Sequence, residues 1–292
     1  MAINQPARKE LPLFPVKALK PLLALAFDED LGSGDVTSIA TLPETHSSKA
    51  LLLAKEPGIM AGLPVISEVF RYKGLAPSIQ YQIEEGAYFS QGDVLVILAG
   101  NTRDLLGCER ILLNFLQRLC GIATVTGAFV DALKGSKTKV LDTRKTLPGW
   151  RALDKYAVAA GGGKNHRQGL YDQILIKDNH AAACGSVREA VLRARSKYGG
   201  GYVIEAEVKT LDELESLFDL PVDIVLLDNM NNELLAESVR LTQLHAPKIK
   251  LEASGNMTLE RVAGLRDFGL DFISVGALTH SVKALDLSLD IK

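Results

Sequence analysis

The stretch VIEAEVKTLDELESLFDLPVDIVLLDNM, residues 203–230, carries a strand, a helix and a second strand in succession. Val203–Val208 and Ile224–Asp228 are short apolar runs that end near charged residues, and Leu211–Leu217 has the apolar spacing of an amphipathic helix. Two parallel strands of one sheet need such a crossover to return to the same edge. The stretch therefore predicts a βαβ unit.

The same pattern extends in both directions from this unit. Further apolar runs occur at Lys139–Asp142, Ile174–Lys177, Ile249–Ala253 and Phe272–Val275, with helical patterns at Glu233–Leu244 and Leu259–Phe268. Six strands, or seven, that alternate with helices favour a closed or nearly closed α/β barrel over an open parallel sheet.

The chain before residue 138 has a different pattern. Short β-prone runs at Ala50–Ala54, Ser78–Ile83 and Val94–Ala99 are separated by turn signals, which predicts a small α+β region. Cys108–Val130 begins with the apolar spacing of a helix and continues into a Gly-, Thr- and Ala-rich stretch that helices tolerate less readily. We expect this helix to connect the two regions.

Composition excludes several classes of protein. The 292 residues are 47% hydrophobic with a net charge of -2, so nothing in the bulk charge favours nucleic acid or an anionic membrane as a partner. The apolar stretch Leu11–Phe27 contains two lysines and three prolines, too many breaks for a membrane span or a signal peptide. Three cysteines without a CxxC pair favour free thiols in a reducing compartment, and we expect the cytoplasm.

Cations gather where the first predicted strands of the barrel end. In α/β barrels the reacting groups lie at the carboxyl ends of strands and in the loops that follow. The cation group consists of Arg144, Lys145, His166, Arg167 and Lys177, with Arg110 available from the preceding helix. Such a group favours an anion with two adjacent carboxylates, because guanidinium groups bind carboxylates in bidentate fashion. Salt bridges to helix acids are the alternative for any single arginine.

Glu207 and Asp228 end neighbouring strands, so their carboxylates are expected to converge. Hard oxygen ligands of this kind suit magnesium, which also binds substrate phosphates. A general acid and base pair, or salt bridges to Lys145 and Lys177, remain alternatives. The late turns Ala253–Asn256 and Val275–Ala277 lie where such barrels bind phosphate through backbone N–H groups.

These motifs resemble those of the quinolinate phosphoribosyltransferases. The resemblance covers nearly everything beyond the first twenty-five residues. It rests on the segments EDLGSGD (29–35), ERILLNF (109–115), LDTRKT (141–146), GGGKNHR (161–167), KDNH (177–180), EAEV (205–208), LDNM (227–230), LEASGN (251–256) and SVGALT (274–279).

The resemblance implies a fold and a domain organisation. We expect an N-terminal α/β-sandwich domain over residues 1–115 and an incomplete, seven-stranded α/β barrel of the type II phosphoribosyltransferase kind over residues 116–280. Residues 281–292 would pack back on the first domain. Two positions depart from the usual pattern, Cys120 and Trp150, and put details of dimer packing or loop shape in doubt.

The resemblance also implies an activity. The reaction transfers phosphoribosyl from phosphoribosyl pyrophosphate to quinolinate with loss of CO2, uses Mg2+ and no organic cofactor, and gives nicotinate mononucleotide for NAD biosynthesis. A homodimer is implied, in which Arg110 reaches the partner's site. The roles carried over are quinolinate binding by Arg144, Lys145, Thr146, His166, Arg167 and Lys177, ribose and magnesium binding by Glu207 and Asp228, and 5-phosphate binding by Ser254, Gly255, Asn256, Val275, Gly276 and Ala277. We expect Glu207, Asp228, Lys145 and Lys177 to be catalytic.

Three alternatives stay open. A phosphoribosyltransferase of the same fold could act on nicotinate or another acidic ring, although two carboxylates suit the cation group better. An aldolase would use Lys177 as a Schiff-base nucleophile. The segment 84–100 resembles a biotinyl or lipoyl carrier hairpin but contains no lysine to be modified.

Overall fold

The computed structural model describes residues 11–292, so the first ten residues of the predicted N-terminal domain lie outside the described part. Packing within the chain divides it into two compact units. The first unit comprises Met1–Gly127, Thr146–Gly162 and Leu278–Lys292, and the second comprises Ala128–Lys145 and Gly163–Ala277. The predicted division into domains at residues 115 and 116 stays a prediction.

The first unit combines strands and helices, as predicted, and its main sheet is antiparallel. Its strand order is β12 (Leu287–Ile291), β1 (Ser47–Ala54), β5 (Val94–Asn101) and β3 (Ser78–Tyr81), and a small separate pair is formed by β2 (Gly58–Ile59) and β4 (Tyr88–Phe89). Alternate residues Ala50, Leu52 and Ala54 of β1 are buried, which is the period of two that a half-buried strand requires. The last strand of the chain thus completes the first sheet.

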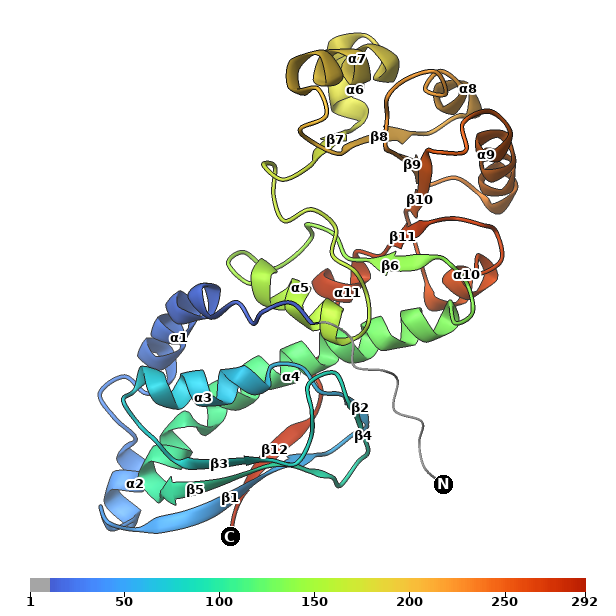
Figure 1. Cartoon of the computed structure of the whole chain (residues 1–292). Coiled ribbons are helices and arrows are strands. Elements are labelled where there is room, and N and C mark those ends of the chain that lie inside the picture. Colours follow the sequence, from blue (N-terminus) through green and yellow to red (C-terminus); the bar gives the residue numbers. More distant parts are fainter. Residues whose placement is uncertain (1–10) are drawn as a thin grey trace. The chain divides into compact units, whose positions relative to one another are not determined.

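Six helices accompany the strands of the first unit in the described part of the chain. They are α1 (Val16–Asp30), α2 (Val36–Thr41), α3 (Leu63–Tyr72), α4 (Thr102–Ala132) and α5 (Arg151–Ala160), followed near the C-terminus by α11 (Ala277–His280). Helices α3 and α4 lie along one face of the sheet (Figure 1). Val65, Ile66, Val69 and Phe70 form the buried face of α3, because they recur at helical spacing.

Helix α4 continues through the glycine-containing stretch that was expected to weaken it. Gly121 allows close approach, because a Cβ there would overlap the backbone oxygen of Lys283. A Cβ at Gly127 would overlap the side chain of Ile59. Among the described residues α4 is also the one helix long and apolar enough to cross a membrane by length and composition, and 67% of its most apolar window is buried inside the protein. That burial is typical of a core helix.

The two unusual positions of the sequence lie in the packing of the first unit. The Trp150 ring stacks on Phe115 with 4.8 Å between the ring centroids, and the Arg118 guanidinium lies 5.5 Å above it. The Cys120 thiol is buried and accepts a 3.5 Å hydrogen bond from the Ala61 N–H.

The second unit is built on a parallel sheet with crossover helices, as predicted. The strand order is β6 (Lys139–Leu141), β11 (Phe272–Ser274), β10 (Lys250–Ser254), β9 (Ile224–Asp228), β8 (Ile204–Val208) and β7 (Ile174–Ile176). The helices are α6 (Asp178–Cys184), α7 (Val187–Tyr198), α8 (Leu211–Glu215), α9 (Asn232–His245) and α10 (Leu259–Gly264). The strands curve as in a barrel (Figure 1), and β6 and β7 remain its two edges within the described part of the chain.

The sheet has six strands where seven were expected. The place of the seventh is taken by a single bridge between Leu141 and Lys164. The segment cannot continue as a strand, because the His166 N–H and the Asn165 side chain bond to the Asp142 carboxylate at 2.8 and 2.6 Å instead of to a neighbouring strand. The irregular segment places the polar residues 164–167 at the open edge of the barrel.

Candidate active site

Polar side chains share one face of the parallel sheet. Glu205 and Glu207 are two residues apart on β8 and therefore point to the same side. Strand register places Glu207 and Glu252 each opposite Leu226, and Ser254 opposite Asp228. The inner face of this apolar sheet therefore carries a band of carboxylates.

Two ion pairs lie side by side at the ends of β7 and β8. Lys177 Nζ is 3.2 Å from Glu207 Oε2, and Lys209 Nζ is 2.9 Å from Asp178 Oδ2. The hydrogen bond from Lys209 lowers the pKa of Asp178, and Asp178 in turn raises the pKa of Lys209. Glu207 is buried, whereas half of the Lys177 side chain is exposed, so this pair lies at the rim of the sheet.

The Asp228 carboxylate is held at both oxygens. Ser254 Oγ donates to Oδ1 at 3.2 Å, and Asn229 Nδ2 donates to Oδ2 at 2.9 Å. Asp228 is half-buried at the end of β9, next to Glu207 in strand order. Its orientation is therefore fixed before any ligand binds.

Arg167 is a buried cation close to a second one. Its side chain is 8% exposed, Nη1 donates to the Gln173 carbonyl at 3.1 Å, and the buried Nε has no hydrogen-bond partner among the described residues. Burial lowers the pKa of Arg167, and the positive charge of Arg144 lowers it further. A bound anion would satisfy Nε and offset the repulsion between the two guanidinium groups.

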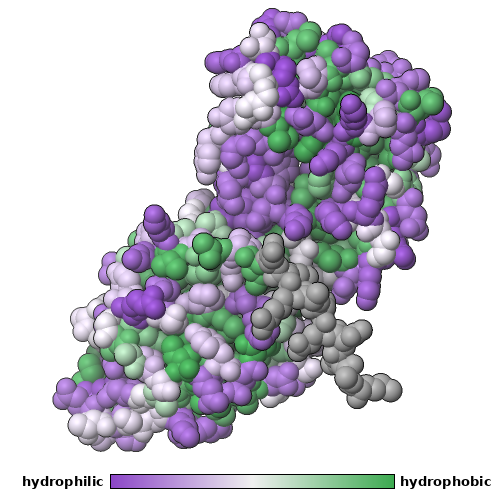
Figure 2. Space-filling view, viewed as in Figure 1, coloured by the Kyte–Doolittle hydropathy of each residue, from purple (hydrophilic) through white to green (hydrophobic). Residues whose placement is uncertain are grey.

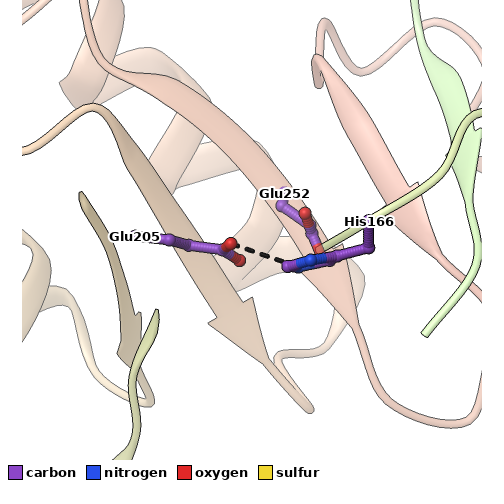
Figure 3. A group of neighbouring side chains, drawn as sticks. All are labelled: His166, Glu205 and Glu252. Carbon is purple, nitrogen blue, oxygen red and sulfur yellow. Dashed lines mark ion pairs between the residues drawn. The ribbon is translucent and has the colours of Figure 1, made fainter. Parts of the chain in front are cut away.

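His166, Glu205 and Glu252 form a cluster in which the side chains point toward one another (Figure 3). His166 Nε2 is 3.1 Å from Glu205 Oε2 and 3.7 Å from Glu252 Oε1. Both carboxyl groups are fully buried. The pKa of Glu252 is raised to about 8, chiefly by burial and secondly by the negative charge of Glu205.

The hydrogen bonds of His166 argue against a metal ion in this cluster. The Arg167 backbone N–H donates to Nδ1 at 2.7 Å, so Nδ1 carries no proton and the neutral ring must carry it on Nε2. A metal bound at Nε2 would need the opposite tautomer. The arrangement instead fits a hydrogen bond from Nε2–H to Glu205, which fixes the segment that carries Arg167.

Comparison with known proteins shows the family of the chain. The model of the quinolinate phosphoribosyl transferase C-terminal domain matches residues 122–290, and that of its N-terminal domain matches residues 35–120. The chain belongs to the quinolinate phosphoribosyltransferase family. The resemblance seen in the sequence motifs is thereby confirmed.

Quinolinate phosphoribosyltransferase relatives match nearly the whole chain. A probable nicotinate-nucleotide pyrophosphorylase (carboxylating) of Bacillus subtilis is 44% identical over 94% of this chain and 93% of its own length. The corresponding protein of Mycobacterium leprae is 43% identical over 94% and 97%. The solved structure of NadC from Streptococcus pyogenes has a TM-score of 0.91 at 39% identity and covers 96% of this chain and 98% of its own.

The second unit brings together most of the site residues predicted from the family motifs. Arg144 and Arg167 interact electrostatically, Lys177 pairs with Glu207, and Asp228 bonds to Ser254. Arg110, exposed on α4, and Thr146, which accepts a 3.2 Å hydrogen bond from Arg151 Nε, belong to the first unit.

The predicted phosphate turns differ in the backbone groups that they offer. The N–H of Val275 already donates to the Leu141 carbonyl at 2.9 Å. Gly255 and Asn256 have positive φ of 94° and 48° and follow directly after β10. Such left-handed residues orient neighbouring N–H groups toward one point, as anion-binding turns do.

Four charged residues that lie close to predicted site residues were not predicted from the sequence. Asp142, Glu205 and Glu252 are fully buried acids, and Lys209 is a further cation at the strand ends. The signal for Glu205 was its spacing of two from Glu207, which puts both on the inner face. Glu252 gave a similar signal, because it lies two residues before Ser254.

Proposed function

We propose that this chain transfers the phosphoribosyl group of phosphoribosyl pyrophosphate to quinolinate and releases CO2 and nicotinate mononucleotide. The observation that carries the proposal is 44% identity over 94% of the chain to a relative named as a carboxylating nicotinate-nucleotide pyrophosphorylase. The buried Arg167, with its unsatisfied Nε beside Arg144, supports an anionic ring as the acceptor.

The chemistry requires two steps. The ring nitrogen of quinolinate forms a bond to C1 of the ribose while the bond from C1 to the pyrophosphate oxygen breaks. The carboxyl group next to the new bond then leaves as CO2, the pyridinium ring accepts the electron pair, and a proton from solvent replaces the carboxyl group. The protein contributes orientation and charge neutralisation.

The cations bind the two carboxylates of quinolinate. Arg144 and Arg167 supply guanidinium groups, and Lys145, Thr146 and Lys177 are the further residues that the family motifs assign to substrate binding. His166 is proposed as a member of the same set, and its hydrogen bonds to Glu205 and to the Arg167 backbone hold the segment in place. Arg167 Nε is available to the anion, because it has no partner among the described residues.

Glu207 and Asp228 face the ribose. Their carboxylates stabilise the positive charge that develops at C1 when pyrophosphate departs. They are also the residues that would hold Mg2+, which neutralises charge on the pyrophosphate. Their fit to a hard cation rests on two carboxylates at the ends of adjacent strands, and the half-exposed Lys177 would have to release Glu207 for the cation to bind there.

The 5-phosphate binds at the turns after the last strands. Ser254, Gly255 and Asn256 form one turn, and Val275, Gly276 and Ala277 form the other. The positive φ of Gly255 and Asn256 supports the first turn as the principal contact.

Two alternatives are weaker on physical grounds. An aldolase needs a desolvated lysine of lowered pKa, whereas Lys177 is half exposed and pairs with Glu207 at 3.2 Å. A nicotinate-specific enzyme would share the fold, since a human nicotinic acid phosphoribosyltransferase structure has a TM-score of 0.60 at 12% identity. That similarity concerns the fold alone.

The proposed assembly is a homodimer in which Arg110 enters the partner's site. The first unit exposes large apolar side chains on its N-terminal helices, among them Leu25, Val36 and Ile39, and Figure 2 shows apolar residues at the surface of this unit. Exposed apolar groups of this kind favour a protein interface. The cytoplasmic location stays a prediction, because one relative from Arabidopsis thaliana is named chloroplastic.

Detection of nicotinate mononucleotide from quinolinate, phosphoribosyl pyrophosphate and Mg2+ tests this function. The purified protein is expected to form the product from quinolinate and not from nicotinate in a parallel reaction. Product from nicotinate alone would assign the nicotinate-specific activity to this fold, and no product from either would contradict the transferase assignment.

A further inference from the structure

The turn after β9 begins with a residue in an unusual backbone conformation. Asn229 has a φ of 55°, and Asn256 is the other non-glycine residue with positive φ among residues 11–292. Glycine adopts this conformation at no steric cost, and asparagine is tolerated there. An asparagine at such a position therefore suggests a function for its side chain.

Among residues 11–292, the one side-chain hydrogen bond of Asn229 goes to the Asp228 carboxylate. Its Nδ2 donates to Oδ2 at 2.9 Å, while Ser254 Oγ donates to Oδ1 at 3.2 Å. Each carboxylate oxygen can accept a second interaction. The two donors thus fix the plane of the carboxylate and leave it able to accept further bonds from substrate.

Asn229 also contacts the turn that follows β10. Its backbone N–H donates to the Ser254 carbonyl at 3.0 Å. A Cβ at Gly255 would overlap the Oδ1 of Asn229, so the side chain lies directly against the glycine backbone. One residue therefore contacts both the proposed ribose carboxylate and the proposed phosphate turn.

The two turns are tied together independently of this side chain. Arg261 of α10 donates from Nη1 to the Gly255 carbonyl at 2.7 Å and from Nη2 to the Met230 carbonyl at 2.6 Å. The backbone of both turns is therefore expected to survive removal of the Asn229 amide. What the amide alone controls is the orientation of Asp228.

We propose that Asn229 is a positioning residue whose side-chain amide holds the Asp228 carboxylate toward the ribose of phosphoribosyl pyrophosphate. This inference rests on the proposed role of Asp228. It adds a residue that acts through Asp228 and does not itself need to contact substrate.

The variant Asn229→Gly separates positioning from folding. Glycine removes the amide but accepts the positive φ, so the melting temperature is expected to stay within about 2 °C of the wild type. The value of kcat/KM for phosphoribosyl pyrophosphate is expected to fall about tenfold or more, the usual effect of losing a hydrogen bond to a charged group. The KM for quinolinate should change less than about twofold, since the cation group is untouched.

Asn231→Gly is the matched control. Asn231 caps α9 by accepting the Leu234 N–H at 2.9 Å, and glycine replaces an asparagine cap at little cost. The same substitution two residues away is therefore expected to leave both kinetic constants unchanged. Asn229→Ala serves as the strained variant and should lower the melting temperature as well as the activity.

A double-mutant cycle with Asp228→Asn tests whether Asn229 acts through Asp228. Asn229→Gly is expected to cost almost nothing further in the Asp228→Asn background. Additive losses would overturn the inference, as would an unchanged Asp228 rotamer in a crystal structure of Asn229→Gly. An Asp228→Asn variant with full activity would instead overturn the proposed role of Asp228 itself, which distinguishes the two failures.

Discussion

Glu252 is a buried carboxyl group on the inner face of the parallel sheet, and its pKa is raised to about 8 by burial and by the charge of Glu205. The groups that face it are Glu205 on β8, His166 on the connecting segment, Ser274 on β11 and Lys177 after β7. At neutral pH the folded protein therefore keeps Glu252 protonated, whereas the unfolded chain ionises it near 4.5.

This difference predicts a pH dependence of stability. As the pH rises from about 4.5 to 8, the unfolded chain releases the Glu252 proton and the folded protein retains it, so folding becomes less favourable. The variant Glu252→Gln has no titrating carboxyl group at this position. Its unfolding free energy relative to that of the wild type should therefore increase as the pH rises across that range. The slope of the difference in unfolding free energy is expected to be at most about 1.4 kcal/mol per pH unit.

Denaturant unfolding of the wild type and of Glu252→Gln at several pH values measures this slope. Glu215→Gln, which replaces an exposed carboxyl group on α8, controls for the loss of a surface charge. Parallel stability curves for wild type and Glu252→Gln would contradict the assignment of the proton to Glu252.

The sequence indicates the position of a side chain most directly at the carboxyl end of a strand. Glu207, Asp228 and Ser254 could be predicted because the ends of parallel strands meet at one edge. Glu205 and Glu252 were not assigned despite their spacing of two from Glu207 and Ser254, since a buried acid inside a strand contradicts the usual composition of a barrel core. The contact of Asn229 with Gly255 depends on a positive φ, which no pattern of residue types reveals.

The sequence predicted the existence of helix α4 but not its ends. The predicted helix covered Cys108–Val130, whereas the structure has Thr102–Ala132. The earlier start arises because Asn101 Oδ1 accepts the N–H groups of Arg103 and Asp104 at 3.0 and 3.3 Å, which caps the helix directly after β5. Its glycines weaken intrinsic helix propensity, but tertiary packing compensates for them.

Two glycines of α4 give opposite predictions for the same substitution. A Cβ at Gly121 would overlap the Lys283 carbonyl oxygen, whereas a Cβ at Gly107 would meet only Leu31 Cδ1 at 3.5 Å. Gly121→Ala is therefore expected to destabilise the protein by about 1 to 3 kcal/mol through overpacking. Gly107→Ala should be neutral, or stabilising by up to about 1 kcal/mol, because alanine favours the helix. Thermal unfolding of the two variants checks this pair, and equal effects would contradict the packing of α4 against residue 283.

The order and pairing of the strands could be predicted only in part. The helix and strand pattern after residue 138 was sufficient to predict a parallel α/β sheet, because each crossover helix is visible as a period of 3.6 residues. The pattern was not sufficient to count the strands. Where a seventh strand was expected, Lys164 makes a single bridge to Leu141 and the His166 N–H bonds to the Asp142 side chain. The pairing of β12 with β1 joins residues more than 200 positions apart, which sequence periodicity cannot show.

The proposed dimer makes a prediction for mixed subunits. If each site needs Arg110 from one subunit and Lys177 from the other, Arg110→Ala and Lys177→Ala proteins are each inactive alone. A mixed dimer of the two contains one site in which both residues are intact. Random exchange of subunits would then restore about a quarter of the wild-type activity. Mixed dimers that form without any recovery would show that the site is not shared.

In the proposed reaction the cation group binds a ring with two carboxylates, one of which leaves as CO2. The most direct measurement is the release of labelled CO2 from quinolinate that carries the label in the carboxyl group beside the ring nitrogen. We expect one labelled CO2 for each nicotinate mononucleotide formed, with release dependent on phosphoribosyl pyrophosphate. Nicotinate mononucleotide formed from nicotinate without any labelled CO2 from quinolinate would contradict the account.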